Sequence, residues 1–310
     1  MSAELRLGVV YRLATSLLSF MVLAMSDPTP SIGQELLSAT DVMSIQHPGA
    51  DLRIPYGPEE LQFGHLRLPE GQGPHPVVIF LHGGCWYAEY DIGHVGSLEA
   101  ALAEAGYAVW SLEYRRIGDA GGSWPGTFLD AALGTDHLRA LAEEYPLDLH
   151  RVVTAGHSAG GHLALWLAAR SKMQSDWELY SATSLPIQGV LALAPAADLE
   201  GLWESGTCGG AVGRLMEGGP AAFPRRYDQG SPMRLVPLGV RQTVFVGAHD
   251  ATWSPPARAY YQAALAAGEE DIRLVEAPES GHFEMIVPGT TTWPLVVEAL
   301  AELLTRVGHP

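Results

Sequence analysis

The stretch "RVVTAGHSAGGHLALWLAAR", residues 151–170, decides the fold because it joins two kinds of secondary structure through one short turn. Its beginning is apolar and β-branched, as in a buried strand, and its end is rich in Ala and Leu, as in a helix. Between them, Gly156 and Gly160 flank Ser158 in a Gly-x-Ser-x-Gly pattern. Glycines remove the Cβ clashes of such a turn, which holds the serine out above the sheet. We therefore predict that Ser158 is a nucleophile.

The rest of the chain continues this alternation of apolar strands and longer helical runs, which is typical of a mostly parallel sheet with helices on both faces. The strands are expected near residues 61–68, 77–82, 108–113, 151–156, 189–194, 242–247 and 272–276. The helices are expected near residues 94–105, 128–144, 159–170, 256–267 and 293–306. The sequence predicts a single α/β domain over residues 26–310.

Residues 200–238 interrupt this rhythm. They are rich in Gly and Pro, as in "TCGGAVGRLMEGG". The segment is too short to bury a core of its own. We expect a lid or pocket wall that sets the depth of the site.

A serine hydroxyl becomes a good nucleophile only when a base takes its proton. Of the 12 histidines, His282 is the best candidate, because "APESGHFEM" follows the last predicted strand. His157 and His162 adjoin the serine, but the turn and the helix direct them elsewhere. His249 and His137 are expected to be a loop residue and a helix residue, respectively.

The base needs a carboxylate that fixes its tautomer. Asp250, in "TVFVGAHDATWSPP", follows a strand and gives the order Ser, Asp, His. Asp198 ends the preceding strand and is the alternative, although a helix cap would also explain it. We predict the triad Ser158, Asp250 and His282.

The stretch "FLHGGCWYAE", residues 80–89, places two glycines directly after an apolar strand. Backbone N–H groups of a glycine-rich loop can stabilise an oxyanion without interference from side chains. We predict that Gly83, Gly84 and Ala159 donate the N–H groups of an oxyanion hole.

Two bulky side chains flank these glycines. His82 is expected to brace the loop rather than to transfer protons. Trp86 is expected either to line the substrate-binding site or to pack in the core.

The segments "HGGCW", "GHSAGGHLALW", "GAHD" and "SGHFE", in this order, resemble the α/β-hydrolase superfamily. The similarity is to its esterase, hormone-sensitive-lipase-like and kynurenine-formamidase-like branch and covers roughly residues 50–305. "EYRR" and "SWPGTFLD" also resemble this branch, which implies that Arg115 and Asp130 are structural braces.

The predicted function is hydrolysis of small carboxylic esters through an acyl-enzyme, with no metal and no cofactor. An arylformamidase that cleaves an N-formylkynurenine-type amide is the alternative. A prolyl-oligopeptidase-like peptidase is disfavoured because the chain has no room for the large gating domain. An inactive ligand-binding module would not require an intact triad.

Composition disfavours two other functions, namely binding to nucleic acid and binding to anionic membranes. The net charge is −17, and Lys172 is the only lysine. Binding to nucleic acid needs clustered Lys and Arg, so it is disfavoured, as is binding to anionic membranes.

The cysteines and the N-terminal residues are the parts of the sequence that relate to whether the protein is exported or cytoplasmic. Cys85 and Cys208 are expected to be unpaired, with one bridge as the alternative if the protein is exported. Arg6 and Arg12 precede the apolar run "LATSLLSFMVLAM", so residues 1–25 resemble a leader and the protein would be exported. Translation from Met25 would instead leave a cytoplasmic protein. A membrane span is disfavoured by Arg12.

Overall fold

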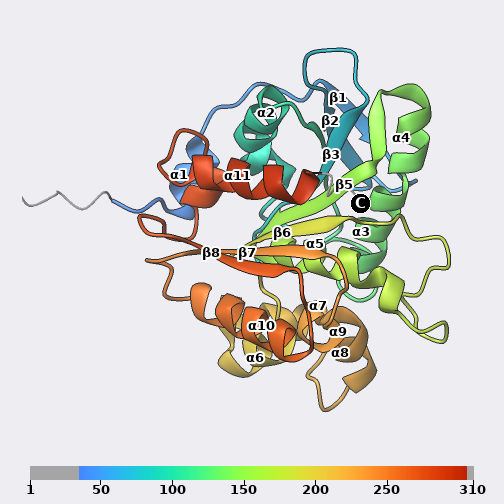
Figure 1. Ribbon diagram of the computed structural model, residues 1–310. Coiled ribbons are helices and arrows are strands. Elements are labelled where there is room, and N and C mark those ends of the chain that lie inside the picture. Colours follow the sequence, from blue (N-terminus) through green and yellow to red (C-terminus); the bar gives the residue numbers. More distant parts are fainter. Residues whose placement is uncertain (1–34, 306–310) are drawn as a thin grey trace, which may run out of the picture. The chain divides into compact units, whose positions relative to one another are not determined.

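The computed structural model describes residues 35–305, and the possible leader lies outside them. Residues 36–305 belong to one compact unit. Its centre is an eight-stranded sheet in the order β1-β2-β4-β3-β5-β6-β7-β8 (Figure 1).

Every strand that the sequence predicts is present. The strands are β1 (Leu52–Pro55), β2 (Phe63–Arg67), β3 (His75–Leu81), β4 (Ala108–Leu112), β5 (Leu147–His157), β6 (Gly189–Leu193), β7 (Arg241–Gly247) and β8 (Ile272–Ala277). The pairs β1–β2 and β2–β4 are antiparallel, and all later pairs are parallel. Strands β4 and β6 are buried throughout, which explains why, apart from Ser111, they are apolar rather than alternating.

Helices cover both faces of the sheet. The α-helices of the described residues are α1 (Ala39–Ser44), α2 (Gly96–Glu104), α3 (Gly126–Asp136), α4 (Leu138–Glu144), α5 (Ala159–Ala169), α6 (Leu199–Ser205), α7 (Thr207–Leu215), α8 (Pro224–Gly230), α9 (Pro232–Leu235), α10 (Ser254–Ala266) and α11 (Trp293–Leu304). Helices α2 and α11 pack on one face, and α3, α5 and α10 on the other (Figure 1). Among residues 35–305 no helix has the length and apolar content to cross a bilayer.

The helix expected over residues 128–144 is divided into α3 and α4. The Trp110 indole donates a hydrogen bond to the Gly134 carbonyl at 2.8 Å, near the end of α3. A Cβ at Gly134 would lie 2.7 Å from Leu112, so the glycine lets the helix approach β4 closely. A long-range contact of this kind cannot be seen in the helical pattern of the sequence.

Two elements near the N-terminus, α1 and β1, are not predicted by the sequence. Strand β1 is a four-residue edge strand, only half buried, that ends at Pro55. Helix α1 has six residues, of which only Val42 is buried. Both are too short to carry a clear periodicity.

The loops that follow the parallel strands bring the predicted site residues to one edge of the sheet. Gly83 follows β3, Ser158 follows β5, Asp250 follows β7 and His282 follows β8. Ligands bind at this carboxyl edge in open α/β sheets. The described fold is the α/β-hydrolase fold.

Candidate active site

Ser158 occupies a strained turn between β5 and α5. Its φ of 56° and ψ of −117° are rare for a residue with a side chain. A Cβ at Gly156 would lie 2.2 Å from the Gly160 carbonyl oxygen, and one at Gly160 would lie 2.0 Å from the Leu81 oxygen. The sharp turn therefore depends on both glycines, as predicted.

Asp250 and His282 come together from two different loops. Asp250 Oδ2 accepts a hydrogen bond from His282 Nδ1 at 2.7 Å, while Asp250 Oδ1 accepts the N–H groups of Thr252 and Trp253. Burial acts to raise the pKa of Asp250, but His282 and these N–H donors outweigh it and lower the pKa. The Trp253 ring stacks on His282, with the ring centroids 5.4 Å apart. Asp250 thus remains ionised and orients the imidazole.

Ser158 and His282 line the same cavity, which has a volume of about 220 Å³. Among residues 35–305 no hydrogen bond joins the Ser158 hydroxyl to the His282 ring. Catalytic hydrogen bonds are often long in unliganded enzymes and shorten when substrate binds. The arrangement can therefore support nucleophilic catalysis.

Of the three predicted oxyanion donors, Ala159 and Gly83 adjoin Ser158, and Gly84 lines the same cavity as Ser158. Ala159 is the first residue of α5, so its N–H has no acceptor within the helix, and the Ser158 side chain does not cap it. A Cβ at Gly83 would lie 3.4 Å from the Ser158 Cβ, which places this loop against the nucleophile. Gly84 has a φ of 107°, and a Cβ there would lie 2.3 Å from Tyr90. Glycine is thus required at position 84 by geometry alone.

His82 braces this loop, as predicted. Its Nε2 lies 3.0 Å from Glu113 Oε1, and its Nδ1 lies 2.8 Å from the Gly83 oxygen. Tyr114 stacks on the ring and donates a hydrogen bond to the His82 carbonyl. Glu113 also accepts the Ile92 N–H. This buried network fixes the backbone that carries Gly83 and Gly84.

The other histidines near the serine have structural partners. His157 is buried, and its Nε2 lies 2.9 Å from the His282 carbonyl oxygen. Burial lowers its pKa well below 6.5, so the ring is neutral. His162 Nε2 lies 2.8 Å from the Gly230 carbonyl oxygen. Neither ring takes the place of His282 beside Asp250.

Trp86 does not line the cavity. Its side chain is 1% exposed and packs edge-on against His162 in the core. Of the two roles considered for this residue, the structure favours core packing.

Asp198 lies at the N-terminus of α6, where its carboxylate accepts the Gly201 N–H at 3.2 Å. The cap explains this residue without a catalytic role. Arg115 and Asp130 form the expected brace, with two parallel hydrogen bonds of 2.7 Å. His249 is exposed in its loop.

The expectation of unpaired cysteines is wrong. Cys85 and Cys208 form a disulfide, with their Cα atoms 6.1 Å apart. The Tyr87 hydroxyl donates a second link to the Cys208 carbonyl at 3.1 Å. The sequence could not reveal the pairing because the cysteines are 123 residues apart and only the fold brings them together.

The cavity wall differs from the prediction. From the segment 200–238, only Thr207 and Cys208 reach the cavity. Helix α1, which the sequence did not predict, contributes three further residues, namely Ala39, Val42 and Met43. The remaining lining includes aromatic side chains beside the triad, among them Trp253 and Phe283. The wall is therefore mainly apolar and is built from segments far apart in the chain.

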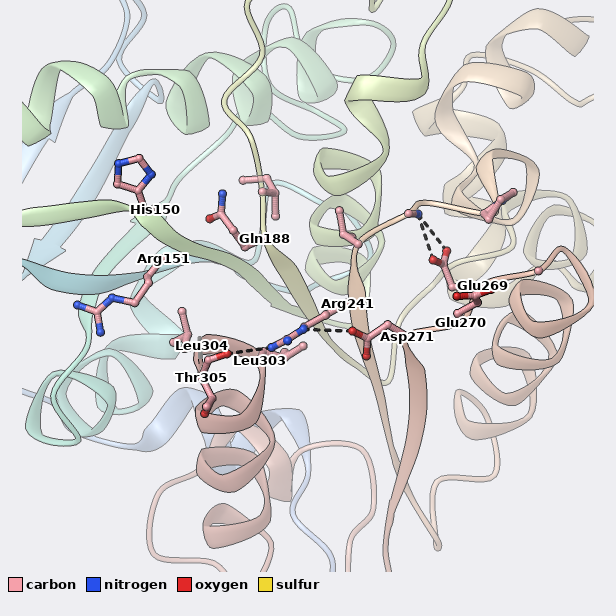
Figure 2. A pocket seen from close by; sticks show the side chains of 15 residues that line it. His150, Arg151, Gln188, Arg241, Glu269, Glu270, Asp271, Leu303, Leu304 and Thr305 are labelled. Carbon is pink, nitrogen blue, oxygen red and sulfur yellow. Dashed lines mark hydrogen bonds and ion pairs between the residues drawn. The ribbon is translucent and has the colours of Figure 1, made fainter. Parts of the chain in front are cut away.

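A larger hollow of about 1040 Å³ lies at the opposite edge of the sheet, around the amino end of β7 (Figure 2). Its charged groups are largely paired: Arg241 contacts Asp271, and Glu269 accepts the Gly239 N–H. Among residues 35–305, no serine or cysteine lines it. We therefore assign the chemistry to the smaller cavity at the carboxyl edge.

Comparison with known proteins agrees with this fold. The chain is 25% identical to esterase LipC of Mycobacterium tuberculosis over 274 residues, which are 82% of this chain and 64% of LipC. It thus spans less than two thirds of the length of this relative.

Two solved structures share the fold. A truncated carbohydrate esterase from gut microbiota has a TM-score of 0.68 at 19% identity, covering 84% of this chain and 98% of that one. Butyrate-bound Est2, a thermophilic esterase from Thermogutta terrifontis, has a TM-score of 0.64 at 20% identity, covering 84% and 95%.

The family model for BD-FAE matches residues 66–252, more than half of the chain. This match includes Gly83, Gly84, Ser158 and Asp250 and ends before His282. The chain belongs to the BD-FAE family.

Proposed function

We propose that this protein is a serine hydrolase of small carboxylic esters. The observation that carries the proposal is that His282, held by Asp250 through a 2.7 Å contact, lines the same cavity as the strained Ser158. A carboxylate, an imidazole and a serine hydroxyl that lines the cavity are the parts needed for acyl transfer.

In the proposed reaction, Ser158 Oγ attacks the ester carbonyl carbon while His282 Nε2 accepts the hydroxyl proton. The carbonyl oxygen becomes an oxyanion that accepts hydrogen bonds from backbone N–H groups of Gly83, Gly84 and Ala159. The carbon–oxygen bond of the ester then breaks, and His282 gives its proton to the leaving alkoxide. Water, deprotonated by His282, attacks the acyl-enzyme and releases the acid.

The size and polarity of the cavity support a small substrate. Its volume of about 220 Å³ is below the roughly 300–1,000 Å³ usual for drug-sized ligands. The apolar lining suits an acyl chain rather than a charged group. The structural relative Est2 binds butyrate, and Est2 is also known phosphonylated by sarin, which are precedents for a short acyl group and a reactive serine.

The test compares wild type with Ser158→Ala on p-nitrophenyl esters of two to eight acyl carbons, with N-formylkynurenine in parallel. We expect hydrolysis of the short esters by wild type and none above background by the variant. A fluorophosphonate should label Ser158, as read by peptide mapping, and fail to label the variant. An active Ser158→Ala protein would refute the triad, and a preference for N-formylkynurenine would favour the arylformamidase.

A further inference from the structure

We propose that Glu284 is a positioning residue that couples the His282 loop to helix α1, and that α1 thereby restricts the site to short substrates. The inference rests on the proposed function, because it assigns a role to groups around the same cavity. Glu284 begins the short 3₁₀ helix η3 (Glu284–Ile286), two residues after His282.

The Glu284 carboxylate links two distant parts of the chain. Its Oε2 accepts the N–H of Gly281, the residue before His282, at 2.7 Å. Its Oε1 accepts the N–H of Leu37, 247 residues away in sequence, at 2.6 Å. The side chain is 2% exposed. Donors stabilise a buried carboxylate, and here each of the two oxygens has one donor.

Leu37 lies two residues before α1, so this contact anchors the helix beside the His282 loop. A Cβ at Gly281 would lie 3.3 Å from the Leu36 side chain, which shows that the same segment also covers this loop. Closing a turn at the start of η3 would need only the local Gly281 contact. The contact with Leu37 is not needed for this turn, because Leu37 is 247 residues away in sequence.

Helix α1 in turn forms part of the cavity wall. Val42 is 3% exposed and lies in the core, whereas Met43 is 57% exposed at the rim. Since the cavity is small, a wall of this kind limits the length of the substrate group beneath it. Loosening α1 should admit longer groups, whereas moving the Gly281 backbone should displace His282 and slow the chemistry.

Two variants separate these effects. Leu37→Pro removes the N–H that reaches Glu284 and leaves the Gly281 contact intact, and Leu37→Ala is its control because it keeps the N–H. Glu284→Gln can accept only one of the two N–H groups, because its NH₂ group faces the other. The exposed Glu279→Gln, on the same loop, is its control.

We expect Leu37→Pro to lower the preference for p-nitrophenyl butyrate over octanoate about tenfold, the low end of the discrimination that one methylene group provides. Its kcat on butyrate should stay within about twofold of wild type. Glu284→Gln should lose the same preference and, in addition, about 10- to 100-fold in kcat, as expected for a misplaced catalytic group. Both controls should match wild type, and melting temperatures and fluorophosphonate titration correct for unfolded protein.

The proposal is overturned if Leu37→Pro keeps the wild-type preference for butyrate over octanoate, or if Leu37→Ala shifts this preference equally. It is also overturned if active-site titration accounts for the whole loss of kcat in Glu284→Gln. A wild type inactive on every ester would instead refute the proposed function. In that case hydrogen exchange still tests the coupling: Glu284→Gln should reduce protection of both residues 38–44 and the Gly281 amide, and unchanged protection would refute it.

Discussion

Replacing Asp250 by asparagine tests the assignment of the acid. Oδ1 of Asp250 accepts the N–H groups of Thr252 and Trp253 at 3.2 and 3.0 Å. These donors require an oxygen, so the asparagine must turn its NH₂ group toward His282 Nδ1. His282 Nδ1 then has to accept a hydrogen bond from this NH₂ group. The ring proton is therefore on Nε2, which faces Ser158. An imidazole in this tautomer cannot take the serine proton.

The expected loss is about 10⁴-fold in kcat, which corresponds to about 5 kcal/mol of transition-state stabilisation. KM should change little, because Asp250 does not line the cavity. The assay is steady-state hydrolysis of p-nitrophenyl butyrate, with the melting temperature measured on the same samples.

Asp198→Asn is the matched control. Asp198 accepts the Gly201 N–H at the start of α6, and asparagine caps helices about as well as aspartate. This variant should keep wild-type kcat. The assignment fails if Asp198→Asn loses as much activity as Asp250→Asn, or if Asp250→Asn retains more than about a hundredth of the activity in a folded protein.

Three further predictions concern stability. Gly160→Ala should prevent folding, because its Cβ would lie 2.0 Å from the Leu81 oxygen; a soluble variant with the wild-type melting temperature would contradict the turn geometry. Burial lowers the pKa of His162 to about 4, so stability should fall as the pH drops from about 6.5 toward 4, where only the unfolded state binds the proton; urea unfolding at pH 7 and 5 should show a weaker fall for His162→Gln, and an equal fall would exclude this histidine. Reduction of the Cys85–Cys208 bond should cost about 2–4 kcal/mol of stability; unchanged urea midpoints with and without dithiothreitol would argue against the bond, and the Cys85→Ser/Cys208→Ser protein should not respond to the reductant.

The sequence by itself was sufficient to predict every strand except β1, and the loops that carry the candidate site. The reason is local: Gly156, Ser158 and Gly160 must stand together in sequence to form one turn, and His82 adjoins the loop that it braces. The positions of Asp250 and His282 after apolar runs also follow from the alternation, because parallel strands end at one edge of the sheet.

The tertiary structure alone decided the features that depend on residues far apart in sequence. It paired Cys85 with Cys208, placed Trp86 in the core, and divided the helix after Gly134. It also brought α1 to the cavity through the contact between Leu37 and Glu284. No local pattern encodes such contacts, because each of them forms only after the sheet has brought distant segments within a few ångströms of one another.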